Sequence, residues 1–112
     1  MIKVRFEKAD KNLILTVKGH AGQAEHGSDI VCSAASILAY TVAQAVARMQ
    51  EGGKLKKKPT IRMEAGDTAI TCKPTKQYYA EALHTFSVIQ LGYDVLHHNY
   101  PDYVQLTKFG EA

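Results

Sequence analysis

The chain has 112 residues, which is enough for one hydrophobic core and too few for two separate domains. Hydrophobic residues make up 46% of it and charged residues 22%, which excludes the composition of a disordered protein. The net charge of +3 is a mild basic bias that identifies no partner by itself. We therefore expect a single domain over residues 1–112.

The start of the chain and its cysteine content indicate a cellular compartment. The segment Met1–Arg5 lacks the apolar run of a signal peptide, and we expect no membrane-spanning segment. The two cysteines, Cys32 and Cys72, are read as thiols, because a disulfide framework would be unexpected in a reducing compartment. The sequence thus predicts a cytoplasmic protein.

The first thirty residues predict a β-hairpin followed by a loop. Apolar residues alternate with polar ones twice, at Ile2, Val4 and Phe6 and again at Leu13, Leu15 and Val17, which is the period of strands with one wet face. The second strand ends at Gly19-His20. Residues 21–28 contain Gly22 and Gly27 and show no periodicity, so we expect a loop with wide conformational freedom.

Residues 30–50 predict a long helix, with Ser28 or Asp29 as N-cap and Gly52-Gly53 as its end. The core positions at helical spacing are Val31, Ala35, Leu38, Val42, Val46 and Met49. Its first half has almost no charged face, so a second helix or a second subunit must cover it. A monomer would expose part of the stripe of Ala34, Ile37, Tyr40 and Ala43. We therefore predict a symmetric homodimer whose contact includes this helix.

The second half of the chain repeats the pattern of two strands and a helix. After a basic loop over residues 54–59, alternation at residues 61–64 and 68–73 predicts a second hairpin. Residues 74–99 predict a helix, with a stripe of Ala80, Leu83, Ser87, Leu91 and Val95 and with Gly92 as a weak point. A last strand follows at residues 104–107. The order ββαββαβ predicts a two-layer α+β domain, a mainly antiparallel five-stranded sheet with two helices on one side.

Reactive side chains concentrate in residues 19–32, between the end of a strand and the start of the helix. Cys32 falls in the first helical turn, where unpaired amides and the helix dipole favour an anion such as a thiolate. His20 lies where the loop returning to that helix begins, so the two side chains can meet. A His that takes the thiol proton, with helix amides to receive an oxyanion, is the minimum for acyl transfer through a thioester.

Other readings of these residues stay open. Cys32 could be a small buried hydrophobe, while His20, His26 and Cys32 would permit a zinc site that still needs a fourth ligand. Cys72 is expected in the core, and His84, His97 and His98 in surface or capping positions.

The basic loop leaves a different class of function open. The lysines of residues 54–58 have no interleaved aromatics, so they predict a solvated turn more than an anion site. A non-catalytic ribosome-associated or RNA-binding module is the rival function that this loop would carry.

The segment also resembles a known family, the ribosomal-processing cysteine proteases called Prp, of the YsxB-like family. The resemblance rests on Gly19-His20-Ala21, Ala24, Gly27, Asp29-Ile30-Val31-Cys32 and Ser36, together with Tyr100-Pro101-Asp102-Tyr103-Val104 near the end. It implies a homodimeric Cys-His endopeptidase that removes an N-terminal extension from large-subunit ribosomal protein L-twenty-seven, cutting after a Phe-Phe pair.

The same resemblance implies a role for each residue of the segment. Cys32 matches the nucleophile and His20 the general base, and Asp29 and Ser36 match polar neighbours of that pair. The loop with Gly22 and Gly27 would close over an extended peptide as a lid. Ser33 and His26 depart from the family pattern, although neither change removes a catalytic group. No cofactor, no metal and no direct nucleic-acid contact is expected.

Overall fold

A computed structural model of the chain describes residues 1–21 and 29–111. Its elements in chain order are β1 (Ile2–Ala9), β2 (Asn12–Lys18), α1 (Ile30–Glu51), β3 (Thr60–Glu64), β4 (Asp67–Cys72), a 3-10 turn (Lys76–Tyr78), α2 (Tyr79–Asn99) and β5 (Val104–Thr107). The predicted order ββαββαβ is confirmed.

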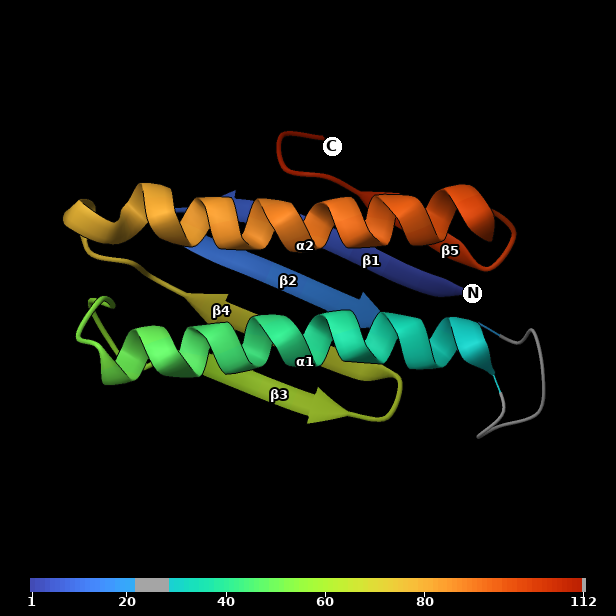
Figure 1. Cartoon of the computed structure of the whole chain (residues 1–112), viewed down its shortest axis with the longest axis horizontal. Helices are drawn as coiled ribbons and strands as arrows, with labels where there is room; N and C mark the ends of the chain where they lie inside the picture. Colours follow the sequence, from blue (N-terminus) through green and yellow to red (C-terminus); the bar gives the residue numbers. More distant parts are fainter. Residues whose placement is uncertain (22–28, 112) are drawn as a thin grey trace.

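The five strands form one mixed sheet in the order β3-β4-β2-β1-β5. Neighbouring strands are antiparallel except β5, which lies parallel to β1 because α2 carries the chain back across the sheet before it. Both helices lie on the same face of the sheet, and they run antiparallel to each other (Figure 1). The alternating burial of β1 and β2 follows from this cover on one face. The two-layer α+β prediction is confirmed.

α1 packs on the sheet as the sequence predicts. Five of the six predicted core positions are buried, and Leu38 is half-buried against the second helix. Ala43, predicted to be exposed, is instead 9% exposed and belongs to the core, while Ile37 and Tyr40 remain at the surface. Ala43 joins Ala39 among the buried residues of the core cluster.

One helix of the structure has the length and apolar composition of a candidate membrane span. The helix Ile30–Glu51 is long and apolar enough to cross a bilayer by length and composition alone. The core helix of a soluble protein passes the same test. Here α1 contributes seven buried residues to the core, from Val31 to Met49, so its packing against the sheet accounts for its apolar composition.

α2 differs from its prediction in both its start and its buried face. Its helix begins at Tyr79, after the 3-10 turn, because residues 73–75 still bond to the loop that follows α1. The buried positions are Ala82, Phe86, Ile89, Tyr93 and Leu96, whereas Leu91 and Val95 of the predicted stripe are exposed. The sequence carries apolar residues on two sides of this helix, and Phe86 and Tyr93 fill more space in the core than the predicted stripe would.

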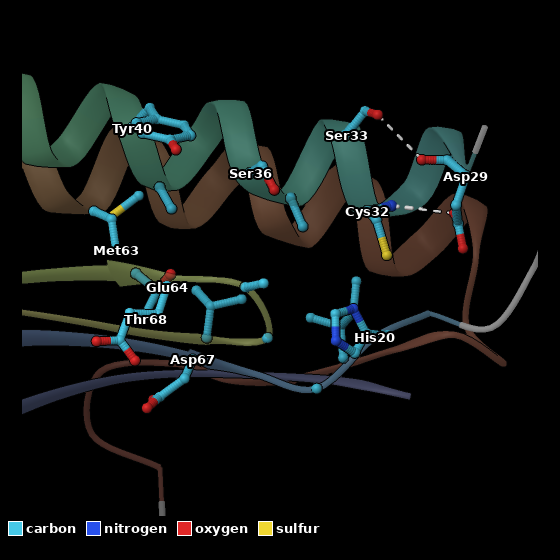
Figure 2. Close-up of a pocket in the computed structure, with 17 residues that line it drawn as sticks. His20, Asp29, Cys32, Ser33, Ser36, Tyr40, Met63, Glu64, Asp67 and Thr68 are labelled. Carbon is cyan, nitrogen blue, oxygen red and sulfur yellow. Dashed lines mark hydrogen bonds between the residues drawn. The ribbon is translucent and has the colours of Figure 1, made fainter. Parts of the chain in front are cut away.

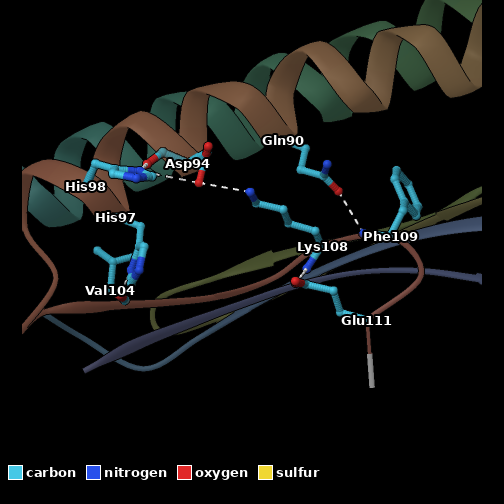
Figure 3. Close-up of polar contacts among 8 residues, drawn as sticks. All are labelled: Gln90, Asp94, His97, His98, Val104, Lys108, Phe109 and Glu111. Atoms are coloured by element: carbon cyan, nitrogen blue, oxygen red, sulfur yellow. Dashed lines mark hydrogen bonds and ion pairs between the residues drawn. The ribbon is translucent and has the colours of Figure 1, made fainter.

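Polar contacts attach α2 to the end of the chain (Figure 3). His97 Nδ1 lies 2.6 Å from the carbonyl oxygen of Val104, which fixes the start of β5 beneath the helix. Gln90 Oε1 accepts the amide of Phe109 at 2.8 Å, and Asp94 pairs with Lys108 at 3.3 Å. His97 was predicted at a surface or capping position, but it is half-buried and contacts β5 instead. These contacts hold β5 beneath α2.

Candidate active site

His20 lies at the end of β2, next to the centre of the sheet, and glycine at position 19 makes this placement possible. Gly19 has φ +90°, and a Cβ there would lie 2.5 Å from the carbonyl oxygen of Met1. The Gly19 amide donates to Gly66 O at 2.9 Å, and the Met1 amine donates to His20 O at 2.7 Å. The backbone on either side of the imidazole is therefore held by hydrogen bonds from two other segments.

Cys32 lies in the first turn of α1, directly across from this strand end. Its sulfur points toward the His20 ring (Figure 2). The amide of Ala21 donates to Cys32 Sγ at 3.3 Å, so a backbone dipole points its positive end at the sulfur. The structure thus brings together the two residues that the sequence singled out.

Asp29 is the N-cap of α1. Its Oδ1 accepts the amides of Val31 at 2.9 Å and Cys32 at 3.2 Å, and its carbonyl oxygen accepts the amide of Ser33 at 3.1 Å. A buried carboxylate at this end satisfies amides that a helix otherwise leaves unpaired and complements the helix dipole. The cap also fixes the turn from which the Cys32 side chain projects.

These same contacts correct one sequence prediction. The first-turn amides were expected to receive an oxyanion, but those of Val31, Cys32 and Ser33 all donate to Asp29. A substrate oxygen could bind them only by displacing the cap. The helix dipole still acts at the site, while these three amides do not form a ready oxyanion hole.

A cavity of about 810 Å³ joins the two side chains. It runs between the first three turns of α1 and the β3–β4 hairpin, whose tip lies beside His20 (Figure 2). Ser36 lines it one turn after Cys32, as predicted, and Tyr40 and Met63 line its far part. A volume of this size suits a ligand of several residues.

Gly66 is a site residue that the sequence analysis missed. It has φ +69°, and a Cβ at this position would lie 2.7 Å from His20 Nε2 and within 3.3 Å of two other ring atoms. Glycine therefore lets the β3–β4 turn pack directly against the imidazole. The sequence signals only a turn at Gly66-Asp67; its contact with His20 depends on the pairing of β2 with β4.

The turn beside Gly66 is fixed by charge. Asp67 pairs with Lys18 of β2 and with Arg62 of β3, the latter at 3.1 Å. Hydrogen bonds from Lys18 and Arg62 hold the pKa of this carboxyl below its usual range. The ion pairs tie the two hairpins together on the His20 side of the cavity.

The other predicted residues lie elsewhere. Gly22, Gly27 and His26, with the lid and zinc hypotheses that use them, lie outside the described residues. Cys72 is buried in β4 as predicted, and burial raises the pKa of its thiol to about 11. Neither cysteine is in a disulfide.

A small α+β domain in which a thiol and an imidazole share a peptide-sized cavity has the arrangement of a thiol-dependent hydrolase. The chain belongs to the family described as cysteine protease Prp, whose model matches residues 1–105. It is therefore a cysteine protease, and the reading as a non-catalytic module is set aside.

Solved structures share its fold. The ribosomal processing protease Prp of S. aureus, bound covalently to a product peptide, is 21% identical with a TM-score of 0.71, over 96% of this chain and 99% of that one. The same protease with a substrate peptide is 20% identical with a TM-score of 0.59, over 96% and 99%. The protein SMU.848 of Streptococcus mutans is 23% identical with a TM-score of 0.68, over 97% and 94%. A comparison with curated proteins gives no match.

Proposed function

We propose that this cysteine protease processes a ribosomal protein, removing an N-terminal extension from large-subunit protein L-twenty-seven, with Cys32 as nucleophile and His20 as general base. The observation that carries the catalytic part is the sulfur of Cys32 pointing toward the His20 ring across a shared cavity (Figure 2). The substrate part is supported by membership in the Prp family and by the S. aureus ribosomal processing protease of the same fold.

The proposed reaction proceeds in two steps. His20 takes the proton of the Cys32 thiol, the sulfur attacks the scissile carbonyl carbon, and the peptide C–N bond breaks as the imidazolium returns the proton to the leaving amine. Water, deprotonated by His20, then attacks the thioester carbon, and the acid product leaves as the thiol regains its proton. No redox partner or metal is needed for this balance.

The neighbouring residues support this reaction in different ways. Asp29 holds the first turn of α1 and so positions Cys32, through contacts of 2.9 and 3.2 Å to the helix amides. Ser36 lies on the cavity wall one turn further along, where its hydroxyl can bond to the backbone of an extended peptide. We assign substrate gating to the loop with Gly22 and Gly27 by resemblance alone.

The decisive experiment uses the N-terminally extended ribosomal protein as substrate. Mass spectrometry and sequencing of the new N-terminus identify the cut, which we expect after a Phe-Phe pair. The Cys32→Ala variant should lose cleavage, and the matched Cys72→Ala variant should keep it, because Cys72 lies in the core away from the cavity. His20→Ala should lower turnover by about two to four orders of magnitude. An active Cys32→Ala protein would refute the nucleophile assignment.

A symmetric homodimer is the second part of the proposal. Three large apolar side chains on α1 are more than half exposed, namely Ile30 at 61%, Ile37 at 62% and Tyr40 at 56%. On α2, Val88, Leu91 and Val95 are exposed as well. Exposed apolar surface across two neighbouring helices supports burial against a second copy.

Light scattering across micromolar concentrations tests the assembly. Ile37→Glu should dissociate the dimer, because in a twofold interface the substitution places a buried charge on both subunits. Ile61→Glu is the matched control, because Ile61 is also exposed but lies on the edge strand β3. A monomeric wild-type protein would refute the proposal. A cytoplasmic location is proposed as well, supported by the two unpaired thiols.

A further inference from the structure

A second hollow lies at the opposite end of the domain from Cys32 and His20. It has a volume of about 280 Å³ and is lined by Lys11, Lys56, Pro74, Lys76 and Tyr79. α1 separates it from the protease site, because the helix begins beside Cys32 and ends just before the loop that carries Lys56. At 1.5 Å per residue the two ends are about 30 Å apart. The two ends of α1 lie at opposite ends of the domain (Figure 1), so this hollow belongs to a different site.

Three segments that are distant in the sequence meet at this hollow. The loop after α1 is held against the end of β4 by an isolated bridge between Leu55 and Pro74. The amide of Lys56 donates to Lys73 O at 2.8 Å, and the amide of Thr75 donates to Lys54 O at 2.9 Å. The β1–β2 turn adds Lys11 on the other side. The basic loop is thus an ordered extension of the sheet.

These segments form what we name the basic end, defined by seven of the eleven lysines: Lys11, Lys54, Lys56, Lys57, Lys58, Lys73 and Lys76. Only two of them have acidic partners, Lys54 with Glu81 at 3.0 Å and Lys73 with Asp10 at 3.5 Å. The other five are without a carboxylate partner within residues 1–21 and 29–111. Their charges repel one another unless an anion binds between them.

Two tyrosines lie among these lysines. Lys11 Nζ lies 5.5 Å from the ring centre of Tyr79, and Lys54 Nζ lies 5.1 Å from that of Tyr78. Both rings are half-buried, so they are held in place and still present some surface. Fixed aromatic faces beside lysines allow bases to stack while phosphates bind the ammonium groups.

We propose that the basic end is a binding site for single-stranded nucleic acid, held through its phosphates by Lys11, Lys56 and Lys76 and through base stacking on Tyr79. The sequence argued against such a contact because the lysine run has no aromatics within it. The fold removes that reason, because other segments bring two tyrosines and three further lysines to the loop. Among the described residues, the exposed large apolar side chains lie outside the basic segments, which favours a nucleic acid over a lipid surface.

Fluorescence anisotropy of labelled twelve-nucleotide uridylate and deoxythymidylate strands tests the proposal. Wild-type protein should bind at 50 mM salt, and log affinity should fall with log salt by about 0.7 for each phosphate contact. Lys56→Gln with Lys76→Gln should lower the affinity about tenfold and reduce that slope by about 1.4. Equal binding of both strands supports recognition through phosphates and stacking alone, and a preference for one strand shows which of the two nucleic acids the site favours.

The matched control removes the same charge from the outer face of the sheet. Lys3→Gln with Arg5→Gln changes two exposed residues of β1 and should leave binding within about twofold, because only long-range charge is lost. Tyr79→Leu should weaken binding about fivefold or more relative to wild type. Tyr79→Phe should bind like wild type, since a phenyl ring also stacks on bases. Thermal melting of each variant confirms its fold.

Three results would overturn the proposal. These are no binding by wild-type protein at 50 mM salt, an equal loss in the control variant, and tighter binding to phosphatidylserine vesicles than to either strand. The last result would identify a membrane surface instead. Peptide cleavage should be unchanged in the Lys56→Gln with Lys76→Gln variant, so that failure of this proposal is distinguishable from failure of the proposed protease function.

Discussion

Replacing Gly66 by Ala tests whether the close packing of the β3–β4 turn against His20 matters for cleavage. The new Cβ would lie 2.7 Å from His20 Nε2, where ordinary contact distances are about 3.5 Å. The ring must therefore move by about 0.8 Å or rotate away from the cavity. Misplacement by about 1 Å can lower a rate 100-fold. We expect kcat/KM to fall roughly 30- to 100-fold, mainly through kcat, because the peptide-binding wall of α1 is untouched.

Gly66→Ala also destabilises the fold, because alanine is strained at a positive φ. The control variant must therefore replace a glycine with a similar φ. An alanine at φ +69° costs about 1 kcal/mol of stability, or about 4 to 6 °C in Tm for a domain of this size. Gly53 has φ +70°, and nothing lies within 4 Å of its Cβ position. Gly53→Ala should therefore show the same loss of Tm with unchanged cleavage.

Steady-state cleavage of a fluorogenic peptide and thermal melting by circular dichroism give the two readouts. If Gly66→Ala cleaves within threefold of wild type while melting like Gly53→Ala, then the packing of the turn against His20 has no catalytic consequence. If both variants lose activity equally, the effect is one of stability and the reasoning also fails.

Four further outcomes follow from the contacts described. Asp29→Ala should lower the free energy of unfolding by about 1 to 2 kcal/mol in urea titrations, while Asp29→Asn, which still caps, should lower it less. Tyr93→Phe removes the 2.8 Å bond to Ala35 O and should cost about 1 kcal/mol, read as a lower Tm. Iodoacetamide should label one thiol of the native protein, Cys32, and both in urea. Because burial raises the pKa of Cys72 to about 11, the native thiol keeps a proton that the unfolded one loses, so unfolding free energy should fall above about pH 9 in wild type and less so in Cys72→Val.

The strands and the first helix could be predicted because each has a hydrophobic period that is visible within its own segment of the sequence. The alternation in β1 and β2 and the stripe of α1 are set by which residues face one core, and burial matches them. α2 could not be predicted as well, because apolar residues occupy two of its sides. The buried side is the one whose Tyr93 packs on Phe6 and donates its hydroxyl to Ala35 O, and these contacts are long-range in the sequence.

The site shows the same limit. His20 and Cys32 are twelve positions apart and flank one loop, so local reasoning could place them together. The role of Gly66 could not be found that way, since it depends on pairing between β2 and β4, whose partners Lys18 and Asp67 are 49 positions apart. The occupied amides of the first turn were missed for a different reason. A capping carboxylate and an oxyanion compete for the same donors, and the sequence does not say which one holds them.

The contact between Leu38 of α1 and Gly92 of α2 restricts movement of α1 along its own axis. A Cβ at position 92 would lie 2.7 Å from Leu38 Cδ2, so Leu38 packs into the space that the absent side chain of Gly92 leaves. A side chain seated in a notch resists sliding of one helix along the other, whereas smooth apolar faces permit it. Leu38 is six residues from Cys32, or about 9 Å along the helix axis. The glycine read from the sequence as a weak point in α2 thus helps to fix how far α1 extends toward His20.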